Sequence, residues 1–194
     1  MYAVVSPAKK LNFDTPAPVN KSTQLKFQDS AYELIKKLRQ CSHEELKKLM
    51  KLSDSIAELN EKRYENYDPE FNEENSKQAL FAFAGDTYVG LDAESLQKAD
   101  IDYAQKHLGI LSGLYGLVRP LDLIQPYRLE MGTRLACGDS KNLYEYWGDN
   151  LTKEMNKLLK KEKVLVNLAS NEYFSVIKTD ELLGDVVTPV FKEK

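Results

Sequence analysis

The sequence predicts a mixed α/β fold, with a central mixed sheet and helices packed around it. Short apolar runs at residues 2–5, 80–84 and 164–168 are rich in strand-favouring residues, as in buried strands. Longer segments with a helical period separate these runs, and strands separated by helices favour a sheet with helices packed on it. Because no internal repeat or linker interrupts residues 1–194, we expect a single domain.

Three helices are predicted in the first third of the chain, after an irregular segment at residues 12–20 that contains two prolines. The second begins with the capping-box pair Ser42 and Glu45. Ser53 or Asp54 caps the third, and its Ile56 and Leu59 are expected to face inward. The first is indicated by apolar residues on one helical face, namely Ala31, Leu34, Ile35 and Leu38.

Two more helices and a last strand are predicted further along the chain. A polar helix at residues 100–107 leads into the apolar residues 109–112. A long amphipathic helix runs from about Leu143 to Leu159, and lysines follow in its last turn, where the helix dipole favours them. A fourth strand is expected at residues 186–191.

The composition is that of an ordinary globular protein. The apolar residues AVILMFWYC make up 42% of the chain and no apolar run is long enough to span a bilayer, which excludes the disordered and membrane classes. Only Cys41 and Cys137 are present, too few for a disulfide framework, and no signal peptide is expected, so we predict a cytoplasmic protein. The net charge of −3 argues against a protein covered in positive charge, although a local basic cleft remains compatible with it.

The stretch at residues 111–133 is the densest in motifs. Gly113 and Gly116 bracket a tight turn that includes Tyr115, and successive backbone amides of such a turn can surround an anion. Arg119 and Arg128 follow, and guanidinium groups bind phosphate through paired donors. The alternative is a loop whose glycines only satisfy turn geometry.

A second set of candidates lies near predicted strand ends. Lys9 and Lys10 follow the first strand directly, where α/β proteins present binding groups. Asp86 follows a glycine at a strand end and serves either as a base or as a turn cap. Arg128 and Glu130 have alternate spacing and form either a structural ion pair or, together with Lys9 and Asp86, the site of an enzyme. Such an enzyme would act on a small phosphorylated or carboxylated substrate.

Six short motifs resemble those of the YaaA family of bacterial peroxide-stress proteins in order and spacing. They lie at residues 6–9 (SPAK), 85–91 (GDTYVGL), 111–122 (LSGLYGLVRPLD), 126–132 (PYRLEMG), 144–147 (YEYW) and 167–174 (NLASNEYF).

The resemblance implies a cytosolic protein that limits oxidative damage and lowers free intracellular iron. It also implies an α/β fold with a basic cleft and a helix-hairpin-helix-like element that binds DNA. We therefore expect contacts with the backbone phosphates of double-stranded or branched DNA, without sequence readout. The predicted DNA-binding residues are Lys9, Lys10, Gly113, Tyr115, Gly116, Arg119 and Arg128. Family members continue beyond Phe191, so we expect the chain to lack a C-terminal segment present in its relatives.

No cofactor and no dedicated metal centre are predicted. His43 and His107 are the only histidines, and neither belongs to the Glu-x-x-His motif of ferritin-type iron sites. No P-loop and no G-x-G-x-x-G motif occurs, so the common nucleotide-binding folds are not indicated. Ser170 lies outside a nucleophile elbow and has no histidine near it in the sequence, which argues against a serine hydrolase.

Overall fold

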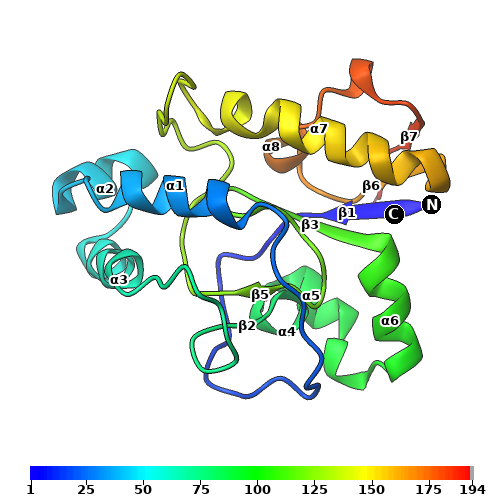
Figure 1. Cartoon of the computed structure of the whole chain (residues 1–194), viewed down its shortest axis with the longest axis horizontal. Coiled ribbons are helices and arrows are strands. Elements are labelled where there is room, and N and C mark those ends of the chain that lie inside the picture. Colours follow the sequence, from blue (N-terminus) through cyan, green and yellow to red (C-terminus); the bar gives the residue numbers. More distant parts are fainter. Residues whose placement is uncertain (193–194) are drawn as a thin grey trace.

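A computed structural model describes residues 1–192 and confirms the mixed α/β class, with a five-stranded sheet at its centre (Figure 1). The strand order is β4-β3-β1-β6-β7. β1 pairs in parallel with β3 and β6, β6 pairs in parallel with β7, and β4 is antiparallel to β3. The strand bounds are β1 (Tyr2–Val5), β3 (Leu108–Ser112), β4 (Gly116–Val118), β6 (Val164–Asn167) and β7 (Asp185–Val187).

The chain reverses its direction of winding at β1. After β1 it crosses over to β3 on one side, and it later returns through β6 on the other side of β1. The carboxyl ends of β1, β3 and β6 therefore lie at one edge of the sheet. In open α/β sheets, ligands bind outside the carboxyl ends of the strands at such a switch point.

Some helices cover the faces of the sheet, and others are grouped beside one of its ends. Figure 1 shows α7 and α6 on opposite sides of the sheet, with α1, α2 and α3 grouped at the end farthest from the N-terminus. The longer helices are α1 (Gln28–Leu38), α2 (His43–Met50), α3 (Asp54–Glu65), α6 (Lys98–His107) and α7 (Leu143–Glu162). The shorter elements are α4 (Ala79–Ala82), α5 (Asp86–Leu91), α8 (Asn171–Phe174), the 3-10 turns η1 (Ala93–Ser95) and η2 (Thr179–Glu181), and the antiparallel pair β2 (Lys77–Gln78) and β5 (Leu123–Ile124). None of these helices is long and apolar enough to cross a membrane.

The sequence predictions for the long helices are confirmed except at α3. There Ile56 and Leu59, expected to face inward, are 37% and 43% exposed, and Ser53 makes no side-chain cap hydrogen bond. The α2 capping box is formed, since the backbone N–H of Ser42 donates to Glu45 Oε2 at 2.7 Å. All four apolar residues on the predicted face of α1 are buried. α7 buries Trp147 completely, and the predicted α7 face packs against β1, β4 and β6. These apolar faces and the buried side of the sheet form one large hydrophobic core.

Two predicted strands differ in the structure. Residues 80–84 do not form a strand: they lie mostly in the short helix α4, and only Phe83 makes an isolated bridge, with Leu11. A short, fully buried apolar run is compatible with a strand and with a helix. Its hydrophobic pattern therefore could not distinguish the two, and the strand prediction was wrong. The last strand is shorter than predicted, because β7 ends at Val187.

The prediction of a helix-hairpin-helix-like element is wrong for residues 98–118. The helix α6 is present, but the glycine turn that follows connects strands β3 and β4, not two helices. Residues 109–112 and 116–118 are fully buried apolar segments that pair with each other in the sheet, and this pairing prevents a second helix.

The β3–β4 turn requires both of its glycines. Gly116 has a φ of +70°, and a Cβ there would lie 2.9 Å from the Trp147 ring. At Gly113 a Cβ would lie 2.3 Å from the backbone oxygen of Leu129. Trp147 Nε1 donates to the carbonyl of Gly113 at 2.8 Å, which fixes the turn on α7. The glycines therefore allow α7 and the segment around Leu129 to approach the turn closely.

We predict that Gly113→Ala lowers the free energy of unfolding by about 3 kcal/mol, because the new methyl group meets a backbone oxygen that cannot move freely. Gly90→Ala in α5 is the matched control, since nothing lies within 4 Å of a Cβ at that position. Urea denaturation followed by circular dichroism measures both. Equal stability of the two variants would contradict the close packing of this turn.

Candidate functional site

Four segments that are distant in the sequence meet at the carboxyl end of the sheet. The loop after β1 is joined to the loop after β6, because the backbone N–H of Ser170 donates to Ser6 Oγ at 2.9 Å. Residues 85–88 join this loop: Tyr88 donates its hydroxyl to the carbonyl of Ser6 at 2.9 Å. Residues 127–132 complete the group, since the N–H of Gly132 donates to Glu172 Oε1 at 3.1 Å.

The centre of this group is a charged cluster of Lys9, Arg128 and Glu130. Arg128 Nε donates to Glu130 Oε1 at 2.6 Å, and Lys9 Nζ lies 3.5 Å from the same oxygen. The side chains of Arg128 and Glu130 are largely shielded, with 22% and 14% exposed, whereas that of Lys9 is 67% exposed. These three residues line a small hollow, which we call the sheet-end hollow, with Pro7, Ala8, Tyr127, Leu129 and Tyr173.

Tyr127 and Tyr173 line the sheet-end hollow, and Tyr64 packs behind its lining segment. The hydroxyl groups of Tyr127 and Ser112 lie 2.7 Å apart in a buried hydrogen bond. Tyr64 of α3 donates its hydroxyl to the backbone carbonyl of Arg128. Burial raises the pKa of the Tyr173 hydroxyl well above the usual value, so that this group stays neutral.

The prediction that the backbone amides of the glycine turn surround an anion is wrong. Gly113, Tyr115 and Gly116 are all buried, and the Tyr115 side chain has no exposed surface. The N–H of Tyr115 donates to Ser112 Oγ at 3.0 Å, and its hydroxyl donates to the carbonyl of Gln125 at 3.0 Å. These three residues cannot contact a DNA phosphate at the protein surface. Their turn supports the segment that carries Arg128.

The structure gives Arg119 a structural partner. Asp122 is completely buried and accepts hydrogen bonds from Arg119 Nη2 at 2.8 Å, from the Arg119 backbone N–H at 2.8 Å and from Thr23 Oγ1 at 2.6 Å. The guanidinium of Arg119 thus neutralises a buried carboxylate, and its direct role in phosphate binding is not supported.

The other two predicted residues, Lys10 and Asp86, lie at the rim of the site. Lys10 is exposed, and its backbone carbonyl accepts from the N–H of Ala84 at 3.0 Å. Asp86 is the exposed first residue of α5 and does not line the sheet-end hollow. Of the four residues of the enzyme interpretation, three therefore converge, and Asp86 stands apart from them.

Sequence reasoning missed a basic groove between α1, α2 and residues 132–135. The groove has a volume of about 830 Å³, and its charged lining residues are Lys37, Lys48, Lys51, Arg134 and Glu45. Within residues 1–192, none of the four cations forms a salt bridge, and the one carboxylate, Glu45, is bound to Ser42 in the capping box. The only sequence signal was a surplus of lysines around α2, which alone is typical of any solvated helix.

The sequence profile of the family described as peroxide stress protein YaaA matches residues 1–194. The chain belongs to this family. It is 53% identical to a UPF0246 protein of Aliivibrio fischeri strain MJ11, a match that covers 100% of this chain and 75% of that relative. UPF0246 proteins of Idiomarina loihiensis and Burkholderia vietnamiensis are 54% and 52% identical to it, and each match covers 100% of this chain and 76% of the relative.

Among the residues that the structure describes, one group resembles a metal site in this YaaA family member. His43, Glu44 and Asp54 bring potential ligand atoms within 4.8 Å of one another. However, Lys47 Nζ lies 2.6 Å from Asp54 Oδ1, and His43 Nδ1 is hydrogen-bonded to Glu61 Oε2 at 2.7 Å. Because a lysine already neutralises the exposed carboxylate, this group is a surface ion-pair network.

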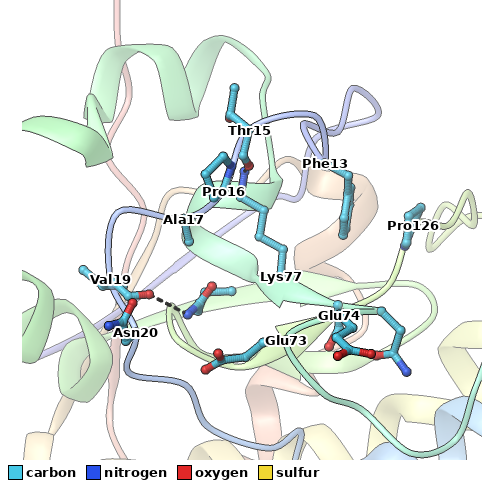
Figure 2. A pocket seen from close by; sticks show the side chains of 13 residues that line it. Phe13, Thr15, Pro16, Ala17, Val19, Asn20, Glu73, Glu74, Lys77 and Pro126 are labelled. Carbon is cyan, nitrogen blue, oxygen red and sulfur yellow. Dashed lines mark hydrogen bonds between the residues drawn. The ribbon is translucent and has the colours of Figure 1, made fainter.

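A separate pocket of about 600 Å³ lies between residues 13–20 and 73–78 (Figure 2). The ammonium of Lys77, a residue that is 7% exposed, donates to the carbonyls of Asn12 and Thr15 at 3.0 and 2.7 Å. Burial lowers the pKa of Lys77. The amide of Gln78 donates to the carbonyl of Val19 at 3.0 Å, the dashed line in Figure 2. These bonds hold the irregular N-terminal segment on β2 and explain both buried side chains structurally.

We predict that Arg119→Ala lowers the free energy of unfolding by about 2 kcal/mol, because Asp122 then stays buried without its cation. The double variant Arg119→Ala with Asp122→Asn should lose less than the sum of the two single losses, since neither charge remains buried alone. Urea denaturation of the four proteins in this cycle measures the coupling. Additive losses would show that the pair does not stabilise the fold.

Proposed function

We propose that this YaaA family member protects DNA during peroxide stress by binding its backbone phosphates in the basic groove. Four cations that form no salt bridge within residues 1–192 line this groove, namely Lys37, Lys48, Lys51 and Arg134, and this observation carries the proposal. Cations that are not neutralised within the protein remain available to phosphates, and binding releases the counterions that surround DNA. Lys9 and Lys10 are exposed and extend the proposed surface toward the sheet end.

The proposed partner is double-stranded or branched DNA, bound without sequence readout. Lysine ammonium groups are point charges that follow the phosphate backbone, whereas base recognition requires groups that reach into a groove of the duplex. The groove is also consistent with the net charge of −3, because a phosphate site depends on a few placed cations and not on the overall charge.

We predict that binding of a labelled duplex depends on salt with a slope of log K against log salt of about −3.6, about 0.9 for each of four phosphates. Lys48→Gln with Lys51→Gln should weaken binding of all sequences alike and reduce the slope by about 1.8. Fluorescence anisotropy at several salt concentrations measures both quantities.

The matched control for this experiment is Lys160→Gln with Lys161→Gln. These two lysines are also exposed and lack salt bridges in the described structure, but they lie at the far end of α7 from the groove (Figure 1). Negligible affinity of the unaltered protein at low salt, or equal loss in both double variants, would remove the groove from the proposal.

We further propose that the protein limits free iron indirectly, through its effect on DNA or on another component, and not by storing the metal. The cluster of His43, Glu44 and Asp54 is exposed and already engaged with Lys47, which is a poor arrangement for holding a cation. The predicted result is that protein purified without oxygen carries no stoichiometric iron in elemental analysis. One iron per chain, lost in His43→Ala, would instead indicate direct binding.

A further inference from the structure

Arg128 is held by one nitrogen only. Its Nε donates to Glu130 Oε1 at 2.6 Å, which fixes the plane of the guanidinium. Its two terminal nitrogens form no hydrogen bond with any residue in the range 1–192, although the side chain is only 22% exposed. Neither terminal nitrogen is among the fully buried side-chain atoms that lack a partner, so both are reachable from solvent. Such terminal N–H groups form the fork that recognises oxyanions. The guanidinium is therefore oriented by Glu130 and keeps donors that no acceptor in residues 1–192 occupies.

Positive charge exceeds negative charge around Arg128. Lys9 and Arg128 share the single carboxylate of Glu130. Arg63 of α3 lies close enough for the Arg128 charge to lower its pKa, although burial is the larger cause of that shift. Two neighbouring guanidinium groups repel each other in a shielded environment, and an anion between or beside them removes this repulsion.

The sheet-end hollow has space beside these donors for a single oxygen atom. Its free volume is about 10 Å³, close to the size of one water molecule. Tyr173 belongs to its lining, and the hydroxyl of this residue has no hydrogen-bond partner among the described residues. The hollow lies at the carboxyl ends of β1 and β6, where the winding of the sheet reverses.

We propose that the sheet-end hollow binds the oxyanion group of a small molecule, a phosphate or a carboxylate. One oxygen of this group enters the hollow and accepts hydrogen bonds from the terminal nitrogens of Arg128 and from the Tyr173 hydroxyl. Lys9 is exposed and flexible enough to turn from Glu130 toward the ligand, and the rest of the molecule stays in the solvent. Glu130 orients Arg128 and, as a carboxylate, competes with the ligand for its charge.

This site is distinct from the basic groove. The hollow and the groove share no lining residue; along the chain, Met131 lies between Glu130 of the hollow and Gly132 of the groove. The inference does not depend on DNA binding, since a small anion does not need the four cations of the groove. Each can therefore fail without the other.

The test is isothermal titration calorimetry of the full chain with inorganic phosphate and, separately, with acetate, at constant ionic strength set by chloride. We expect binding of at least one of the two anions by the unaltered protein. Arg128→Lys should weaken it about tenfold or more, because the ammonium keeps the charge but loses the fork. Glu130→Gln should strengthen it severalfold, because the amide oxygen still accepts from Arg128 Nε while the competing negative charge is gone.

The pattern of affinities across the variants distinguishes binding in the sheet-end hollow from binding elsewhere on the protein surface. Lys160→Gln with Lys161→Gln, at two lysines that line neither the hollow nor the groove, is the control and should leave anion binding unchanged. Tyr173→Phe, which removes one hydroxyl, should weaken binding severalfold and replaces Arg128→Lys if that variant does not fold. Binding of phosphate alone or acetate alone identifies the ligand group. No binding of either anion, unchanged affinity in both the Arg128 and Tyr173 variants, or loss of binding in the Lys160 and Lys161 control would overturn the proposal.

Discussion

The close approach between Gly113 and the backbone of Leu129 is the constraint on which the site depends. No side chain fits at Gly113, because a Cβ there would lie 2.3 Å from the Leu129 oxygen. Trp147 fixes the same turn from the side of α7 through its bond to the Gly113 carbonyl. The turn between β3 and β4 is thereby fixed, and residues 127–132 pack against it. This packing places Arg128 and Glu130 at the edge of the sheet. The glycine motif at residues 113–116, which in the sequence indicates an anion-binding turn, instead positions the guanidinium of Arg128 in the fold.

Ion pairs are distributed unevenly between the basic groove and the rest of the molecule. Many carboxylates have cationic partners away from the basic groove: Asp122 is bound by Arg119, and hydrogen bonds from Lys21 and Lys98 lower the pKa of Asp102 to about 2. Such pairs use acidic residues in stabilising the fold, whereas Lys37, Lys48, Lys51 and Arg134 of the basic groove form no salt bridge with any described residue. A net charge of −3 is therefore compatible with a locally basic surface, because potential near a surface follows placement and not the total.

Much of the fold could be predicted from the sequence, because the long helices and the strands β1 and β6 depend on local patterns. The α1 face and the α2 capping box are complete within a few residues, and both are present. β3 and β4 were missed because residues 108–118 become strands only through pairing with each other and with β1. The same holds for the site: Lys9, Arg128 and Glu130 could be named individually, but their convergence follows from the sheet order. The buried partner of Arg119, three residues away, was visible in the sequence only as one of several acidic residues.

The segment that carries Arg128 is fixed before any ligand arrives, and this bears directly on what the sheet-end hollow can do. Tyr64 donates to the carbonyl of Arg128, the Leu129 oxygen lies against Gly113, and Tyr127 is bonded to Ser112. A guanidinium on a mobile loop loses its own conformational freedom on binding, and that entropy opposes association. Here the entropy has already been lost in folding, and Nε is anchored by Glu130 as well. Such rigidity favours a binding group when its ligand is small and offers few contacts of its own, because little further ordering opposes association.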